Sequence, residues 1–283
     1  MDVEHALRDF LVSRRTQLSP GDVGLQPHGP RRVAGLRREE VAALASVSVD
    51  HYIRLERGHG SLVSDMVLES VADALRLNAS ERIYLRNLAR PTAAPQRDAR
   101  TQDGVRQSIQ DFIDSLRVPA YVIGRNGVIL AWNRMAAVVF LDFAEVPRPR
   151  RSLGWLFFND PRVRRLYDDW ESKSRQAVGY LRSEWGKRPD DPLLGRHVRE
   201  LSQGSAEFRR MWHEHSVREC TSDTYRMFCS ATGRVLELTG ESLRLTDDAD
   251  EVVVVSTAAK GSSSAEALKE VALRLETQEA LYG

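Results

Sequence analysis

Few side chains in this 283-residue chain stand at the spacings that catalysis or metal binding requires. His213 and His215 flank Glu214, but alternate residues of a helix project roughly 200° apart and cannot easily share one ion. Their spacing also differs from the His-Glu-x-x-His of zinc proteases. Cys220 and Cys229 form no Cys-x-x-Cys pair, and such cysteines in a β-rich region are usually small core residues. The residues therefore indicate a protein that is not an enzyme and needs no cofactor.

A second set of side chains can bind the edges of DNA bases. Arg54 can contact a guanine edge bidentately, Asp50 can accept a hydrogen bond from cytosine, and Val49 can touch a thymine methyl. Arg38 and Arg57 stand at the two ends of the same stretch, where they can contact phosphates. Arg31 and Arg32 of the preceding loop can reach the DNA backbone or the minor groove. The predicted DNA-binding residues are therefore Arg31, Arg32, Arg38, Ser48, Val49, Asp50, His51, Arg54 and Arg57.

These side chains need two short helices that cross at a steep angle, and residues 38–57 have the pattern of such a helix-turn-helix. Ala42 is the small residue where the helices would touch. Ser46 would occupy the turn, where many such motifs have glycine because glycine permits positive φ, and Ser48 can cap the second helix. The expected core positions are Val41, Ala45, Val47, Tyr52 and Leu55.

The residues around this motif also favour helices. Apolar spacing predicts a helix over 5–18, and N-caps at Ser64 and Ser80 predict two more after the motif. Residues 1–90 are therefore expected to form an all-α domain of five helices. Residues 91–104 contain almost no large apolar side chain and indicate a linker.

Beyond the linker the pattern changes to strands around a helical middle. Two β-rich runs over 120–132 flank Asn126-Gly127, the strongest short hairpin signal, and Asn133 can cap the helix that follows. Residues 133–218 have helical patterns, and strand runs return over 224–257. This order predicts an α+β, PAS-like domain over 105–259, followed by a C-terminal linker and helix over 260–283.

All five tryptophans of the chain lie in this second domain. Large rings leave irregular gaps when they pack around a sheet, and a long apolar ligand can fill such a gap, although aromatic residues at helical spacing are more often plain core. A carboxylate head group would need an arginine or tyrosine, for which Arg134, Tyr167 and Arg209 are candidates. The predicted ligand-binding residues are Trp132, Met135, Phe140, Leu156, Phe157, Leu166, Tyr167, Trp170, Leu181, Trp185, Phe208 and Trp212.

The chain resembles a known family along nearly its whole length. Leu36-Arg-Arg-Glu-Glu-Val-Ala-Ala-Leu-Ala and Arg54-Leu-Glu-Arg-Gly are similar to the phage-repressor (XRE) type of bacterial regulator, and Ser19-Pro-Gly-Asp-Val-Gly-Leu to its MmyB-like branch. The similarity continues through Pro119-Ala-Tyr-Val-Ile, Ala131-Trp-Asn-Arg, Leu156-Phe-Phe-Asn-Asp-Pro, Pro189-Asp-Asp-Pro, Glu207-Phe-Arg-Arg-Met-Trp and His215-Ser-Val-Arg-Glu. The resemblance implies a lambda-repressor-like DNA-binding domain and a PAS-like sensor whose apolar pocket is associated with fatty-acid-like ligands.

The sequence thus predicts a transcription regulator whose small apolar ligand shifts its affinity for an operator in double-stranded DNA. A homodimer is expected, because one recognition helix reads only a few base pairs. The alternative is a redox or metal-dependent enzyme or sensor module with a helical adaptor. The longest apolar run, Met135–Leu141, is far shorter than the roughly 20 residues of a membrane span. With no signal-peptide pattern and few cysteines, the cytoplasm is the expected location.

Overall fold

The computed structural model describes residues 2–26, 35–61, 63–91, 104–218, 222–246 and 250–282, and the chain divides into two compact units. Unit 1 comprises residues 1–95, 182–199 and 210–219, and unit 2 comprises residues 96–181, 200–209 and 220–283. Two stretches of the predicted second domain therefore pack with the N-terminal helices. Residues 92–103, which make up most of the predicted linker over 91–104, lie outside the described ranges.

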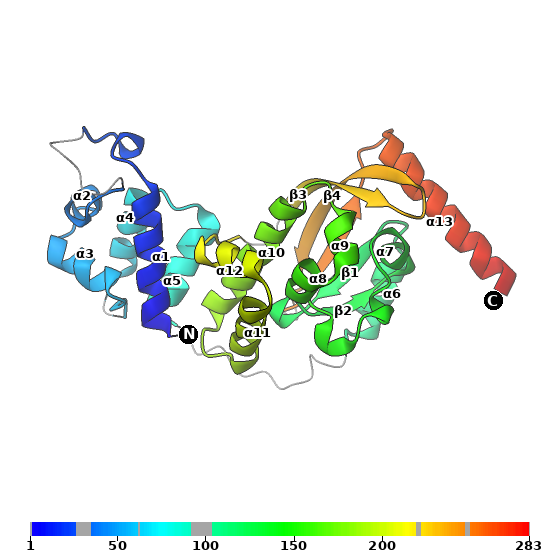
Figure 1. The fold of residues 1–283 in the computed structure, drawn as a ribbon, viewed down its shortest axis with the longest axis horizontal. Coiled ribbons are helices and arrows are strands. Elements are labelled where there is room, and N and C mark those ends of the chain that lie inside the picture. The colour runs from blue at the N-terminus through cyan, green and yellow to red at the C-terminus, as the bar shows by residue number, and fades with distance from the viewer. Residues whose placement is uncertain are drawn as a thin grey trace. The chain divides into compact units, whose positions relative to one another are not determined.

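Unit 1 is helical in its described N-terminal part. Its α-helices lie close to the predicted positions and are α1 (Val3–Gln17), α2 (Arg38–Leu44), α3 (Val49–Glu56), α4 (Asp65–Ala74) and α5 (Ala79–Ala89) (Figure 1). The short helix η1 (Gly21–Val23) was not predicted. One predicted helix start was wrong: α5 is capped by Asn78, not Ser80. The Asn78 side chain accepts a hydrogen bond from the Glu81 amide at 3.0 Å, and the Glu81 carboxylate accepts one from the Asn78 amide at 3.0 Å. Two backbone donors are satisfied in this way, whereas a cap at Ser80 would satisfy neither.

Unit 2 is built on an antiparallel sheet. Its strands are β1 (Ala120–Ile123), β2 (Ile129–Trp132), β3 (Ser222–Cys229), β4 (Arg234–Arg244) and β5 (Val252–Thr257), in the order β2-β1-β5-β4-β3. The β1–β2 turn contains Asn126 and Gly127 with φ of 60° and 70°, the left-handed conformation that the Asn-Gly pair predicts. The fold is therefore α+β, as predicted.

Most helices of the second half of the chain lie between β2 and β3 in the sequence, while one precedes β1 and one follows β5. They are α6 (Gln107–Asp114), α7 (Arg134–Val139), α8 (Leu153–Asn159), α9 (Pro161–Leu166), α10 (Trp170–Lys187), α11 (Pro192–Gly204), α12 (Ala206–His213) and α13 (Ser263–Tyr282), with short turns η3 (Arg125–Gly127), η4 (Phe143–Glu145) and η5 (Arg148–Arg150). The ranges of α10, α11 and α12 each include residues of both units. No helix among the described residues is long and apolar enough to cross a bilayer.

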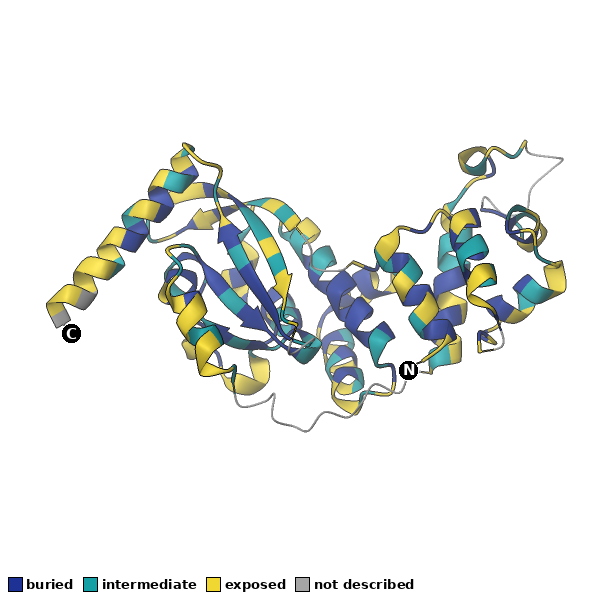
Figure 2. Ribbon diagram, turned by 180° about the vertical axis from the view of Figure 1, so that it is seen from behind, coloured by how far each residue is buried: buried dark blue, intermediate teal, exposed yellow. Residues whose placement is uncertain are grey.

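The two faces of the sheet pack against different helices, because successive residues of a strand point to opposite sides. Tyr121 and Ile123 pack into a core with α8, α9 and α10, whereas Ala120 and Val122 pack with α6. Along β3 and the first half of β4, exposed residues alternate with buried or half-buried ones, so one face of these strands is covered (Figure 2). The buried residues there include Cys229, which packs against α7 and α13 as a small core residue.

Candidate DNA-binding helix and ligand pocket

The turn between α2 and α3 has the geometry that a helix-turn-helix requires. Ser46 adopts a φ of 55° and its amide donates to the Ala43 carbonyl at 3.1 Å, while the Val47 amide donates to the Ala42 carbonyl at 3.0 Å. This pair of bonds is a Schellman motif, which ends α2 and redirects the chain into α3. Ala42 is fully buried, whereas Val47 is only half-buried although it was predicted to lie in the core.

The first turn of α3 is capped and its outer face is accessible. The Ser48 hydroxyl accepts a hydrogen bond from the His51 amide at 3.2 Å, which satisfies one of the unpaired donors of the helix start. Val49, Asp50 and Arg54 are exposed, and His51 is half-buried. Tyr52 and Leu55 on the opposite face are fully buried, so the exposed side chains are held on a packed helix. The predicted residues brought together on α3 and its caps are Ser48, Val49, Asp50, His51, Arg54 and Arg57.

Arg38 has an internal partner that the sequence pattern did not reveal. Its guanidinium lies 3.0 Å from the Glu56 carboxylate, and Arg15 binds the other side of the same carboxylate at 3.0 Å. Burial by itself would raise the pKa of Glu56, but the hydrogen bonds and charges of the two arginines lower it overall. Arg38 therefore ties the start of α2 to the end of α3, while half of its side chain is exposed. Arg31 and Arg32 lie outside the described residues.

The later helices of unit 1 pack on α1 and α5 through buried polar contacts. Arg182, which is 1% exposed, donates to the Trp212 carbonyl, and its guanidinium lies 4.0 Å from the centre of the Trp212 ring. Arg14 of α1 donates to the His215 carbonyl. Burial, and then the charges of Arg182 and Arg14, lower the pKa of His215 to about 3, so this imidazole is neutral.

A second contact in unit 1 is a ring packed on a glycine. A Cβ added to Gly186 would lie 2.2 Å from the Tyr84 ring, so only glycine allows α10 to approach α5 this closely. Tyr84 is buried and makes an edge-to-face contact with Phe10 of α1, with ring centres 5.1 Å apart. The end of α10 is therefore part of the core of unit 1.

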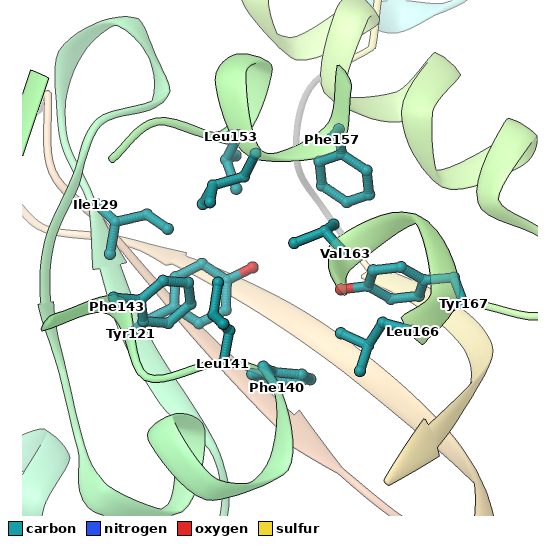
Figure 3. A pocket seen from close by; sticks show the side chains of 11 residues that line it. Tyr121, Ile129, Phe140, Leu141, Phe143, Leu153, Phe157, Val163, Leu166 and Tyr167 are labelled. Atoms are coloured by element: carbon teal, nitrogen blue, oxygen red, sulfur yellow. The ribbon is translucent and has the colours of Figure 1, made fainter. Parts of the chain in front are cut away.

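Unit 2 contains an apolar pocket between its sheet and the helices α8 and α9 (Figure 3). The cavity has a volume of about 40 Å³. Its lining residues are Tyr121, Ile129, Phe140, Leu141, Phe143, Leu153, Leu156, Phe157, Val163, Leu166 and Tyr167. Except for two phenol hydroxyls, the lining side chains are hydrocarbon.

Five of the predicted ligand residues line this pocket, namely Phe140, Leu156, Phe157, Leu166 and Tyr167. Trp132 and Trp170 pack on the same core without lining the pocket, and Met135 belongs to the core against α13. Leu181 is buried, and Phe208 packs edge-to-face on Phe158 with ring centres 5.2 Å apart. The remaining two, Trp185 and Trp212, are buried residues of unit 1.

The lining residues that the sequence reasoning missed come mainly from the sheet and the turns beside it. Tyr121 and Ile129 point from β1 and β2 to the pocket side, and Phe143 and Leu153 follow in the next segments. Strand alternation could have selected Tyr121, since its neighbours Ala120 and Val122 are small or aliphatic and face α6. Of the polar candidates, only Tyr167 lines the pocket. Arg134 and Arg209 are exposed, and Arg209 donates to the Ser202 carbonyl.

Within the described residues, no three His, Cys, Asp or Glu side chains come together as metal ligands. Cys220 lies outside those residues.

Comparison with known proteins assigns both parts of the chain. Residues 105–271, more than half of the chain, match the model of the MmyB-like transcription regulator ligand binding domain. Residues 29–85 match the model of a helix-turn-helix domain, which includes α2, the turn and α3. No curated protein matches significantly. With a helix-turn-helix ahead of this ligand-binding domain, the chain belongs to the MmyB-like transcription regulators.

Proposed function

We propose that this regulator reads an operator with α3 and responds to a small apolar, fatty-acid-like ligand in the pocket of unit 2. The observation that carries the proposal is the almost entirely hydrocarbon pocket inside a domain matched to a ligand-binding family, in a chain that also has a helix-turn-helix. The sheet supports a PAS-like fold, because β1 and β2 precede the helical middle and β5 returns beside β1.

The DNA-reading role is assigned to the exposed start of α3. Val49 and Asp50 are exposed on the first turn of α3, and Arg54, whose planar guanidinium matches guanine, is exposed one turn later. Arg57 is exposed at the C-cap of α3 and Arg38 at the start of α2, both placed for phosphate contact. Because Arg38 also binds Glu56, its replacement would weaken DNA binding partly by loosening α2 from α3.

The ligand-binding role follows from the chemistry of the lining residues. Each buried methylene contributes about 0.8 kcal/mol, so a chain of eight carbons in this pocket is enough for measurable affinity. The cavity volume of about 40 Å³ is smaller than the roughly 150 Å³ of a cavity that holds benzene. An acyl chain would therefore displace lining side chains such as Phe140 and Leu166 as it enters, and this displacement is the conformational change that binding would drive.

Helix α10 is the proposed route from pocket to DNA-binding helices. At its start, the Trp170 indole donates to the carbonyl of Phe157, a lining residue, at 3.0 Å. At its end, Arg182 and Gly186 contact Trp212 and Tyr84 within unit 1. A ligand that moves Phe157 would thus act on the start of α10. Operator affinity would change by the ligand's differential affinity for two arrangements of the protein and no more.

We also propose that the regulator binds DNA as a homodimer in the cytoplasm. Two recognition helices double the number of base contacts, and their symmetry calls for a pseudo-palindromic operator with half-sites about one helical turn apart. Apolar side chains exposed on β3–β4 and on α13, such as Phe228, Leu243 and Leu273, offer surfaces for pairing. Sedimentation of the full chain with and without DNA tests this state, and a monomer that binds one asymmetric site tightly would contradict it.

A mobility shift with DNA from upstream of the protein's own gene tests the regulator itself. Adding an eight-carbon acyl ligand should change the affinity of the full chain for this DNA. Val163→Phe, which fills the pocket, should abolish the response, whereas Phe112→Trp, which adds bulk at an exposed position of α6, should keep it. An equal response in both variants would contradict the assignment of the pocket.

A further inference from the structure

The short turn ahead of α8 gathers three arginines. Arg148, Arg150 and Arg151 belong to η5 and its C-cap. The Arg151 amide donates to the Arg148 carbonyl at 3.1 Å, and side chains three residues apart in such a turn lie on the same side. Among the residues that the structure describes, no carboxylate forms an ion pair with any of the three. This turn is therefore a local excess of positive charge.

The guanidinium of Arg151 is held in place but makes few hydrogen bonds. It lies 4.8 Å from the centre of the Trp132 ring, and its Nη2 donates to the Val146 carbonyl at 2.9 Å. A guanidinium has five N–H donors, yet this is the one hydrogen bond that the side chain makes to the described part of the chain, and its Nε is buried without a partner. Burial, and then the charge of Arg148, lower the pKa of Arg151, while Asp142 opposes them. An anion beside this guanidinium would offset both of the lowering causes.

Arg151 lies one aromatic ring away from the lining of the pocket. Trp132, on which it stacks, packs edge-to-face on Phe143 with ring centres 5.5 Å apart. The Arg151 carbonyl accepts a hydrogen bond from the Ile129 amide at 3.0 Å, and Leu153 follows two residues later. Phe143, Ile129 and Leu153 all line the pocket (Figure 3). The guanidinium therefore lies beside the part of the pocket that is formed by β2, η4 and the start of α8.

We propose that Arg151, with Arg148 beside it, binds the anionic head group of an apolar ligand whose chain enters the pocket next to Phe143. This inference rests on the proposed function, since it concerns the head group of the same ligand. A planar guanidinium binds a carboxylate through two parallel N–H donors, and hydrogen bonds between ionised groups are about twice as strong as those between neutral ones. A free acid would therefore bind in preference to an alcohol of the same chain length.

Three probes test the inference on the full chain at neutral pH and low salt: octanoate, octan-1-ol and acetate. Dissociation constants come from calorimetry or from titration followed by tryptophan fluorescence. We expect octanoate to bind about 5- to 10-fold more tightly than octan-1-ol, the margin between a hydrogen bond to a charged group and one to a neutral group. Added salt should reduce this margin, because it screens the attraction between charges. Acetate, which has the head group without the chain, should bind far more weakly than octanoate.

Variants of the turn assign the preference to individual arginines. Arg151→Gln should lower the affinity for octanoate to about that for octan-1-ol, with octan-1-ol binding unchanged, and the exposed Arg148→Gln should lower it by a smaller factor. Arg150→Gln is the matched control, because it removes the same charge from the same turn but its guanidinium lies over a different ring, 5.4 Å from the centre of Trp155. It should keep the preference for octanoate. Unchanged octan-1-ol binding shows that each variant retains the pocket, and Arg148→Gln still tests the site if Arg151→Gln does not fold.

The outcomes separate the head-group site from the pocket itself. If octan-1-ol binds as tightly as octanoate to the unmodified protein, the pocket stands and the head-group assignment is wrong. The assignment is also wrong if Arg150→Gln reduces the preference as much as the variants of Arg148 and Arg151, or if acetate binds as tightly as octanoate. If octanoate, octan-1-ol and their longer homologues all fail to bind, the apolar pocket of the proposed function fails and the head-group site fails with it.

Discussion

Replacing Ser46 by glycine should stabilise unit 1, because this residue holds a backbone conformation that glycine adopts without strain. Its φ of 55° lies in the left-handed region, which costs an L-residue about 1–2 kcal/mol. Glycine avoids that cost but loses about 0.5–1 kcal/mol more backbone entropy on folding. The expected net gain is about 0.5–1 kcal/mol. For a unit somewhat larger than 100 residues, this corresponds to a rise of about 2–6 °C in Tm.

Scanning calorimetry of the full chain measures this change. The variant should raise the transition of unit 1 and leave that of unit 2 in place. Arg76 has a φ of 51° and ends α4 with the same pair of backbone hydrogen bonds. Arg76→Gly is therefore a matched variant that should raise the same transition for the same reason. Ala43→Gly is the opposite control: it places glycine inside α2 on an exposed position, where it should destabilise by about 1 kcal/mol. A lower Tm for Ser46→Gly, with Ala43→Gly behaving as expected, would refute the reasoning.

Three further changes test the buried contacts of unit 1. Glu56→Gln should lower the free energy of unfolding by about 3–5 kcal/mol in denaturant titrations at neutral pH. Because the pKa of Glu56 is lowered in the folded state, its carboxylate contributes fully to stability above pH 4.5 and this contribution is lost on acidification. The difference in stability between the variant and the unmodified protein should therefore become smaller in acid. His215 is neutral in the fold with a pKa of about 3, so stability should fall as the pH drops from 6.5 toward 3, and His215→Asn should flatten that dependence in pH-stepped melts. Gly186→Ala should cost about 1–3 kcal/mol by displacing the Tyr84 ring, and an unchanged Tm would contradict the packing of α10 on α5.

Much of the fold follows from short-range signals in the sequence. Asn126-Gly127 specifies a turn with positive φ, and Asn133 caps α7, as its side chain accepts from the Ala136 amide at 2.8 Å. Ser48 caps α3 as expected. These features depend on a few neighbouring residues, so the sequence alone predicts them. The cap at Asn78 was also readable, because Glu81 three residues later completes a capping box.

The site was harder to predict because it depends on contacts between distant segments. Nothing local distinguishes Trp185, buried in unit 1, from Trp170, which packs beside the pocket; their surroundings depend on how α10 meets other helices. The pairing of Arg38 with Glu56 likewise depends on the crossing of α2 and α3. Aromatic composition therefore predicted that a pocket could exist but selected only part of its lining.

Selection of binding sites from random duplex DNA tests the central claim most directly. The full chain should enrich one pseudo-palindromic site, with half-sites about one helical turn apart. Arg54→Ala should lose preference at the base pair that Arg54 reads, at a cost of about 1–3 kcal/mol there, and keep the preferences at other positions. If the chain enriches no sequence, or if Arg54→Ala enriches the same site with the same preferences, α3 is not the recognition helix and the account is contradicted.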